Sequence, residues 1–167
     1  RTMGEKLHFL GAYGVREVCG LRVAFLSGHY NAATYNTADV DFVGGAFTVR
    51  AISQLQRRVT KDPKKRGIDV LLTCGWPAGC DQEIVDEAQR PPKLENDKMW
   101  QLACAPALAE LCCVIEPRYH IFGSANLFYQ RPPFKTMRRG HACRCIGLGQ
   151  VGSISKQKWI HALALSP

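Results

Sequence analysis

The sequence of 167 residues lacks the short motifs by which many nucleotide-binding and hydrolytic enzymes are recognised. It contains no phosphate loop, no G-x-G-x-x-G turn and no G-x-S-x-G nucleophile elbow. It also lacks an apolar run of the roughly 20 residues that cross a bilayer, because Leu102–Ile115 is interrupted by Pro106 and Glu110. From the residues alone we therefore expect no membrane partner and no enzyme of these classes.

Signals for secretion are also missing, although the chain has eight cysteines. No secretory signal peptide opens the sequence. Cys104, Cys112 and Cys113 lie in an apolar segment that resembles a helix, and Cys143 and Cys145 lie in one that resembles a strand. Because free cysteine behaves as a small hydrophobic residue, we expect buried thiols in a reducing, intracellular compartment rather than a disulfide framework.

The positive charge, a formal net charge of +8, is concentrated in two segments. Arg50–Arg66 carries seven basic residues against the single acid Asp62, and Arg131–Arg144 carries five basic residues and no acid. Such blocks favour RNA or an acidic protein as a partner, and the alternative is a solvated helix end and loop. The candidate RNA contacts are Arg57, Arg58, Lys61, Lys64, Lys65, Arg66, Lys135, Arg138 and Arg139.

The hydrophobic pattern predicts one layered α/β domain over residues 1–167. Helical periodicity predicts an amphipathic helix within Gly45–Thr60 and a second helix from about Asp97 to Ile115, kinked or divided by Pro106. Loops are expected at 29–44 and 79–97. The expected strands are two joined at Cys19-Gly20 within Val15–Gly28, then Ile68–Thr73, Pro117–Ser124, Leu127–Gln130, Ala142–Gly147 and Lys158–Leu165, with the last three mutually antiparallel if short turns connect them.

Two cysteine-containing stretches are candidate ligand positions. Cys74 follows the strand Ile68–Thr73 directly, where open α/β sheets hold ligands and metals, but it can also be a small residue that fills a gap. His141, Cys143 and Cys145 alternate along a strand and can therefore share one face of the sheet. Zinc ligands usually have wider spacing, so two thiols packed in the core are the favoured alternative.

Five motifs together resemble one family. "IDVLLTCGWP", "PRYHIFG", "YQRPPF", "GHACRCIGLGQVG" and "KQKWIHALALSP" are similar, in order and spacing, to the CwfJ-type splicing factors, spliceosome-associated relatives of the lariat-debranching enzyme. The resemblance covers most of the chain from about Leu7 to Pro167. It implies that the chain is the second half of an N-terminal metallophosphoesterase-like domain, and thus a partial domain. The fold that it implies is an α/β sandwich of two sheets flanked by helices.

The resemblance also implies a degenerate metal site. Active debranching enzymes read Leu-Ser-His-Asp-Trp-Pro at the first motif, which places Cys74 at the histidine and Gly75 at the aspartate. Their later Ala-His-Leu-His motif places its histidines at Ser124 and Asn126. The Gly-Asp and Gly-Asn-His motifs of the superfamily occur nowhere in the sequence. No metal, no cofactor and no catalytic residue are therefore expected.

What the resemblance implies for function is a catalytically inactive scaffold in pre-mRNA splicing and intron-lariat turnover in the nucleus. Its partners would be the lariat-debranching enzyme or other spliceosomal proteins, with RNA as a further candidate. Trp76, Arg118, Tyr119 and His120 are candidate contacts with a ligand or partner, although Tyr119 and His120 can equally be packing residues. Two alternatives stay open: an active metal-dependent phosphodiesterase whose other ligands lie upstream, and a basic RNA-binding domain.

Overall fold

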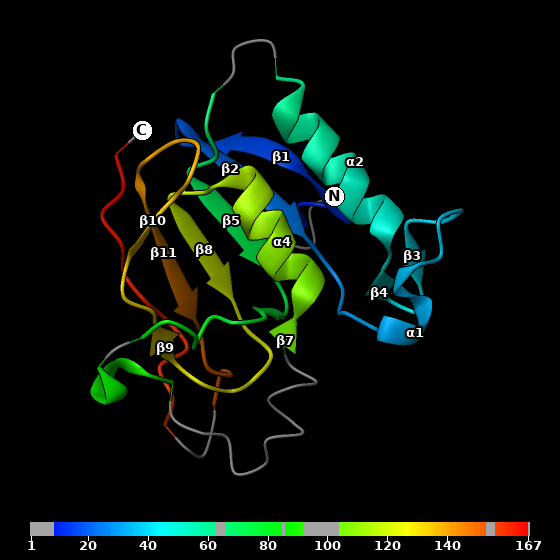
Figure 1. Cartoon of the computed structure of the whole chain (residues 1–167). Helices are drawn as coiled ribbons and strands as arrows, with labels where there is room; N and C mark the ends of the chain where they lie inside the picture. Colours follow the sequence, from blue (N-terminus) through cyan, green and yellow to red (C-terminus); the bar gives the residue numbers. More distant parts are fainter. Residues whose placement is uncertain (1–8, 63–65, 85, 92–103, 153–155, 167) are drawn as a thin grey trace.

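A central sheet organises the protein, as seen in a computed structural model that describes residues 9–62, 66–84, 86–91, 104–152 and 156–166 (Figure 1). Its strand order is β1-β2-β5-β8-β11-β10, and β9 pairs with β11 beside this path. Strands β2, β5, β8 and β11 are parallel, whereas β1, β9 and β10 pair antiparallel with their neighbours. The strands are β1 (Tyr13–Val18), β2 (Leu21–Leu26), β5 (Val70–Thr73), β8 (Tyr119–Phe122), β9 (Tyr129–Gln130), β10 (Phe134–Lys135) and β11 (Ala142–Gly147).

The first two strands form the hairpin that the sequence predicts. Cys19 and Gly20 both have positive φ, 51° and 81°, as a two-residue turn between right-twisted strands requires. Val18 pairs with Leu21 at the turn, and Tyr13 pairs with Leu26 at the far end. The predicted strands at Ile68–Thr73, Pro117–Ser124 and Ala142–Gly147 are also confirmed, as β5, β8 and β11.

Two helices, α2 (Val49–Thr60) and α4 (Pro106–Ile115), contact each other, and α4 lies across the sheet in Figure 1. The amphipathic helix α2 is confirmed, although the short strand β4 (Ala46–Phe47) occupies the start of its predicted range. The second predicted helix is confirmed over Pro106–Ile115, but Pro106 does not kink the helix there. Pro106 instead begins α4, where the missing N–H costs nothing because the first amide groups of a helix have no partner within it.

Cys104 lies just before α4 and belongs to a strand rather than to the predicted helix. Cys104–Ala105 is β7, which pairs in parallel with β6 (Trp76–Pro77). The predicted start at Asp97 lies outside the described residues.

The loop at 29–44 contains the short helix α1 (Ala32–Tyr35) and ends in β3 (Phe42–Val43), which pairs with β4. The described part of the loop at 79–97 contains the 3-10 turn η1 (Glu87–Gln89). Among the described residues there is one large sheet with two two-stranded ones, and the second large sheet of a sandwich is not found there. None of the described helices has the length and apolar character needed to cross a membrane.

The prediction of a strand at Lys158–Leu165 is wrong, because this segment is irregular and largely exposed. Strand β11 already pairs with β8 on one side and with β9 and β10 on the other, so it offers no free edge to a further strand. Leu127–Gln130 forms a strand only over Tyr129–Gln130, and its antiparallel pairing with β11 is as predicted.

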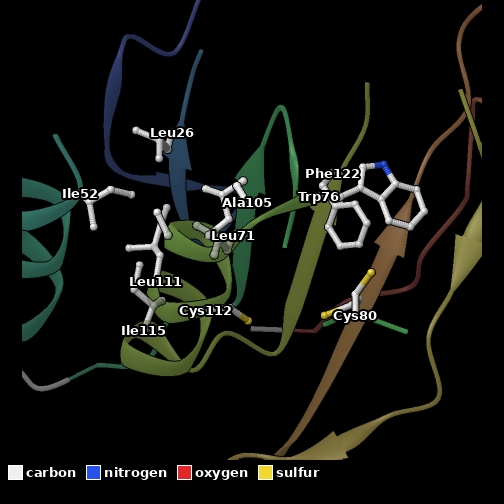
Figure 2. Packing of buried hydrophobic residues seen from close by; sticks show 14 of the residues in the cluster. Leu26, Ile52, Leu71, Trp76, Cys80, Ala105, Leu111, Cys112, Ile115 and Phe122 are labelled. Atoms are coloured by element: carbon white, nitrogen blue, oxygen red, sulfur yellow. The ribbon is translucent and has the colours of Figure 1, made fainter. Parts of the chain in front are cut away.

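The core lies between the sheet and the two helices. In Figure 2, Leu71 of β5 and Leu111 of α4 meet in this layer, and Ile52 of α2 approaches from the side. Leu71 and Leu111 are fully buried and Ile52 nearly so, and burying one such side chain contributes about 1.5–3 kcal/mol. This apolar layer fixes the strands whose two ends carry the polar groups described next.

Candidate functional site

The carboxyl ends of β5, β8 and β11 meet at one edge of the sheet, the lower edge in Figure 1. A pocket of about 510 Å³ opens there, and we call it the carboxyl-edge pocket. Its lining comes from the last residues of β5 and β8, from the loops that follow β8 and β11, and from Trp159. The polar side chains that line it belong to Thr73, Ser124, Asn126 and Gln150, and the aromatic ones to Phe122 and Trp159.

Two of the predicted metal-site positions, Ser124 and Asn126, line this pocket in an unusual backbone conformation. Their φ angles are 74° and 50°, in the left-handed region that residues other than glycine rarely adopt. The side-chain oxygen of Asn126 accepts a hydrogen bond from the backbone N–H of Gln150 at 3.0 Å. Such conformations cost of order 1–3 kcal/mol each and cluster at functional sites, which makes this loop the best-supported site candidate.

The other two predicted positions lie beside the pocket. Cys74 directly follows β5 and is exposed, and its carbonyl accepts a hydrogen bond from the backbone N–H of Gly123 at 3.3 Å. The carbonyl of Gly75 accepts a hydrogen bond from the Thr73 hydroxyl at 2.9 Å. The structure therefore gathers Cys74, Ser124 and Asn126 at one edge of the sheet, although only Ser124 and Asn126 line the pocket itself.

The side chains at this edge do not fit a two-metal hydrolytic centre. Such centres hold their ions with carboxylate and imidazole groups and use them to activate water. The described residues that line the pocket offer hydroxyl and amide groups and an indole, and no carboxylate or imidazole. The one group of three potential metal ligands found among the described residues lies elsewhere, at Cys112, Cys143 and Cys145.

Trp76 is a core residue that fixes the end of β11. It is fully buried, with ring centroids 4.8 Å from Phe122 and 6.0 Å from Tyr129. A Cβ atom at Gly147 would lie 2.5 Å from the indole, so only glycine allows this approach. This placement favours a packing role for Trp76 over contact with a ligand.

His120 of β8 is also fully buried. Its Nε2 lies 2.9 Å from the Thr73 hydroxyl, which itself donates to the Gly75 carbonyl. The Nε2–H of His120 must therefore be the donor in this pair. Burial lowers the pKa of His120 from 6.5 to about 4, so the ring is neutral at physiological pH. His120 supports Thr73, a pocket residue, without lining the pocket itself.

Arg118 and Tyr119 lie at the opposite edge of the sheet, where β8 begins. The Arg118 guanidinium is 3.0 Å from a carboxylate oxygen of Asp69. The Arg144 guanidinium lies 5.6 Å from the centre of the Tyr119 ring, within cation–π range. Because strands have direction, the two ends of the "PRYHIFGS" segment are at opposite edges, and only its last residues reach the pocket.

The amino-terminal edge brings the two basic segments of the sequence together. Its residues line a pocket of about 580 Å³, and we call the five basic ones, four arginines and a histidine, the basic edge. Arg66 comes from the first segment and Arg139 from the second. The sequence did not single out the buried Arg22 of β2, because its place here depends on strand order. The basic edge consists of Arg22, Arg66, Arg118, Arg139 and His141.

Acidic residues neutralise part of this charge. Arg22 is 2.9 Å from Asp62, and Arg66 is 3.2 Å from Glu17. Of the predicted RNA contacts, Lys64 and Lys65 lie outside the described residues. The seven that the structure describes all have exposed side chains, namely Arg57, Arg58, Lys61, Arg66, Lys135, Arg138 and Arg139.

Glu116, a residue that the sequence did not indicate, fixes the position of the second basic segment. It ends α4 in a left-handed conformation, with φ of 49°, and is only 3% exposed. Its two carboxylate oxygens accept hydrogen bonds from the backbone N–H groups of Arg138 and Arg139, at 2.7 Å and 2.9 Å. The carboxylate thus holds the loop between β10 and β11 and leaves both arginine side chains exposed.

The chain is similar over nearly its whole length to several known proteins. No family model matches it. It is 28% identical to CWF19-like protein 1 of Xenopus laevis over 99% of its own length, and 31% identical to the Drosophila melanogaster homolog over the same share. The chain is similar to CWF19-like protein 1. It is also 32% identical to the zinc finger CCCH domain-containing protein 64 of Arabidopsis thaliana, over 98% of its length.

The CWF19-like relatives support the CwfJ-type resemblance of the five motifs. The chain covers only part of these proteins. It spans 28% and 29% of the two CWF19-like proteins and 25% of the Arabidopsis protein.

Proposed function

We propose that the chain is a catalytically inactive, metallophosphoesterase-like module of a splicing-associated CwfJ-type protein, and that it acts in the nucleus as a binding scaffold. The observation that carries this proposal is the carboxyl-edge pocket. Cys74, Gly75, Ser124 and Asn126 stand where the family resemblance expects metal ligands, and the pocket offers hydroxyl and amide groups instead. Such groups bind polar ligands through hydrogen bonds but cannot hold two hydrolytic metal ions.

The partner of this scaffold is the lariat-debranching enzyme or another spliceosomal protein, and the scaffold serves intron-lariat turnover. Trp159 supports a protein partner at the carboxyl edge, because it lines the pocket and is 48% exposed. Exposed tryptophan is enriched where proteins bind one another. Binding to the purified debranching enzyme by calorimetry tests this step, with Trp159→Ala expected to weaken it at least tenfold and Trp159→Phe to restore most of it.

The test of inactivity is an assay for phosphodiester hydrolysis. The protein is incubated with a branched 2′,5′-linked RNA and with a simple aryl phosphodiester, in the presence of Mn²⁺, Fe²⁺ or Zn²⁺. We expect no product above the metal-only background, with a debranching enzyme as positive control. Hydrolysis that is lost in Cys74→Ser or Asn126→Ala would contradict the proposal and support the alternative, an active phosphodiesterase.

A second function, RNA binding, is favoured by the basic edge. Arg66 and Arg139 come from separate basic segments and line one pocket, as backbone recognition of a nucleic acid requires. Phosphate contacts of this kind give affinity without base specificity. The basic edge and the carboxyl-edge pocket use opposite ends of the same strands, so RNA and a protein partner can be bound at once.

The RNA-binding test uses fluorescence anisotropy of a labelled single-stranded RNA at graded salt. Affinity should fall steeply with salt, and Arg139→Glu should weaken binding by roughly tenfold or more at low salt. Arg90→Glu is the matched control, because this substitution changes the net charge by the same amount. Arg90 lies beside η1 and is not part of the basic edge. Equal losses in the two variants would mean that net charge, and not the basic edge, is responsible.

A further inference from the structure

Three buried thiols meet at one point in the core. The sulfur atoms of Cys112, Cys143 and Cys145 all lie within 4.8 Å of one another. Cys143 and Cys145 alternate on β11 and therefore face the same side of the sheet, where α4 packs and presents Cys112. Their exposed fractions are 7%, 0% and 3%, so all three residues are buried.

The separation of the sulfur atoms suits a metal ion. A Zn–S bond of about 2.3 Å in a tetrahedral site places neighbouring sulfurs roughly 3.8 Å apart. The sulfur atoms already lie within 4.8 Å of one another, so two of them reach that spacing if each moves by about 0.5 Å or less. Well-ordered atoms fluctuate by about 0.5 Å along one axis. Thiolate sulfur is also the ligand that soft ions such as Zn²⁺ and Cu(I) select.

We propose that Cys112, Cys143 and Cys145 form a three-thiolate binding site for a zinc ion. Packing alone explains why small apolar residues occupy these positions, but it does not require sulfur at all three. His141, the third ligand of the pattern "HACRC", takes no part, because its side chain lines the basic edge instead. The third thiol comes from α4, so the ion would join the helix to the centre of the sheet.

The surroundings supply what such a site still needs. Cys112 and Cys145 line a cavity of about 200 Å³ together with Cys80 and Arg131, which leaves room for a fourth ligand, a water molecule or a further thiol. Three thiolates and Zn²⁺ carry a net charge of −1, and the Arg131 guanidinium in the same cavity offsets it. Burial of the three cysteines strengthens this attraction, because charges interact more strongly away from bulk water.

The site does not depend on the proposed scaffold function, because it lies in the core behind α4 and not at the carboxyl-edge pocket. A zinc ion there would contribute folding free energy, since the unfolded chain cannot hold the three thiolates together. The site is therefore structural in the first place, and any regulation through it would act on the docking of α4 against β11.

Metal titration of the reduced, chelator-stripped protein tests the proposal. We expect one Co²⁺ per chain, with the near-ultraviolet absorption that thiolate-to-cobalt charge transfer gives, and stoichiometric displacement by Zn²⁺. Cys145→Ser should weaken zinc binding by roughly 100-fold, because it removes a ligand. Even the loss of a residue that only orients a ligand costs about 10–100-fold in metal affinity. Circular dichroism establishes whether this variant folds.

Two control variants separate this buried site from exposed cysteines elsewhere in the chain. Cys19→Ser removes a thiol in the β1–β2 turn, and Cys74→Ser removes the thiol at the carboxyl edge. Neither should change the cobalt spectrum. A wild-type protein without thiolate-to-cobalt absorption would overturn the proposal whether or not Cys145→Ser folds. So would binding that disappears in Cys74→Ser and persists in Cys145→Ser.

Discussion

Acidification should destabilise the protein through His120. Burial lowers the pKa of this residue from 6.5 to about 4, and its side chain is fully buried. Below pH 6.5 the unfolded chain takes up a proton at this position, whereas the folded protein does so only near pH 4. The contribution of neutral His120 to stability is therefore fully present above pH 6.5 and is lost as the pH falls to about 4.

The size of this effect follows from the pKa difference. A shift of one unit corresponds to 1.36 kcal/mol, so the free energy of unfolding should fall by roughly 3 kcal/mol between pH 7 and pH 4 through this residue alone. Carboxylates that titrate in the same range add their own contributions. A variant in which position 120 cannot titrate is therefore needed to isolate the effect.

Urea unfolding at several pH values, followed by tryptophan fluorescence, measures this contribution. His120→Gln keeps an N–H donor for Thr73 but does not titrate, so its stability should fall less than that of the wild type by about 3 kcal/mol over this range. His161→Gln is the matched control and should behave as the wild type. Equal losses of stability in the wild type and His120→Gln would refute the reasoning, because His120 would then titrate as a solvated residue.

Three further substitutions test the packing and hydrogen bonds that position the two edges. Gly147→Ala places a Cβ atom 2.5 Å from the Trp76 indole, so we expect it to lower the free energy of unfolding by about 1–3 kcal/mol in urea, and an unchanged midpoint would contradict this packing. Glu116→Ala leaves two backbone amides of the β10–β11 loop without their acceptor and should cost about 1–3 kcal/mol per group; faster hydrogen exchange of those amides is the direct readout. Thr73→Val leaves the buried N–H of His120 unpaired, with an expected loss of about 1–3 kcal/mol, and Thr73→Ser should retain most of the stability.

The sequence predicted the elements whose formation depends on residues close together in the chain. The β1–β2 hairpin follows from two apolar runs around Cys19-Gly20, and α2 follows from apolar residues at helical spacing. Pro106 shows where such signals become ambiguous. Proline disrupts the interior of a helix but favours its first position, and only the pairing of Cys104–Ala105 with β6 decides between the two.

The thiol cluster and the basic edge depend on contacts between distant segments. Sequence alone placed Cys143 and Cys145 on one face of a strand, but it could not add Cys112, because the packing of α4 against β11 brings the third thiol there. In the same way, Arg22 joins the basic edge only because β2 lies next to β5. Residue spacing shows which side chains share a face of one helix or strand, whereas strand order and helix packing determine which elements meet.

The two edges are far enough apart to act independently. Strand β8 has four residues and a rise of about 3.3 Å per residue, so the basic edge and the carboxyl-edge pocket are separated by at least about 10 Å along the strands. This exceeds the Debye length of about 8 Å at physiological ionic strength, so charge at one edge has little influence at the other. Raising the salt concentration should therefore release RNA from the basic edge while a partner held at Trp159 by apolar contact stays bound. If both ligands left together, the RNA and the protein partner would have to share one surface, and the separation of the two roles would fail.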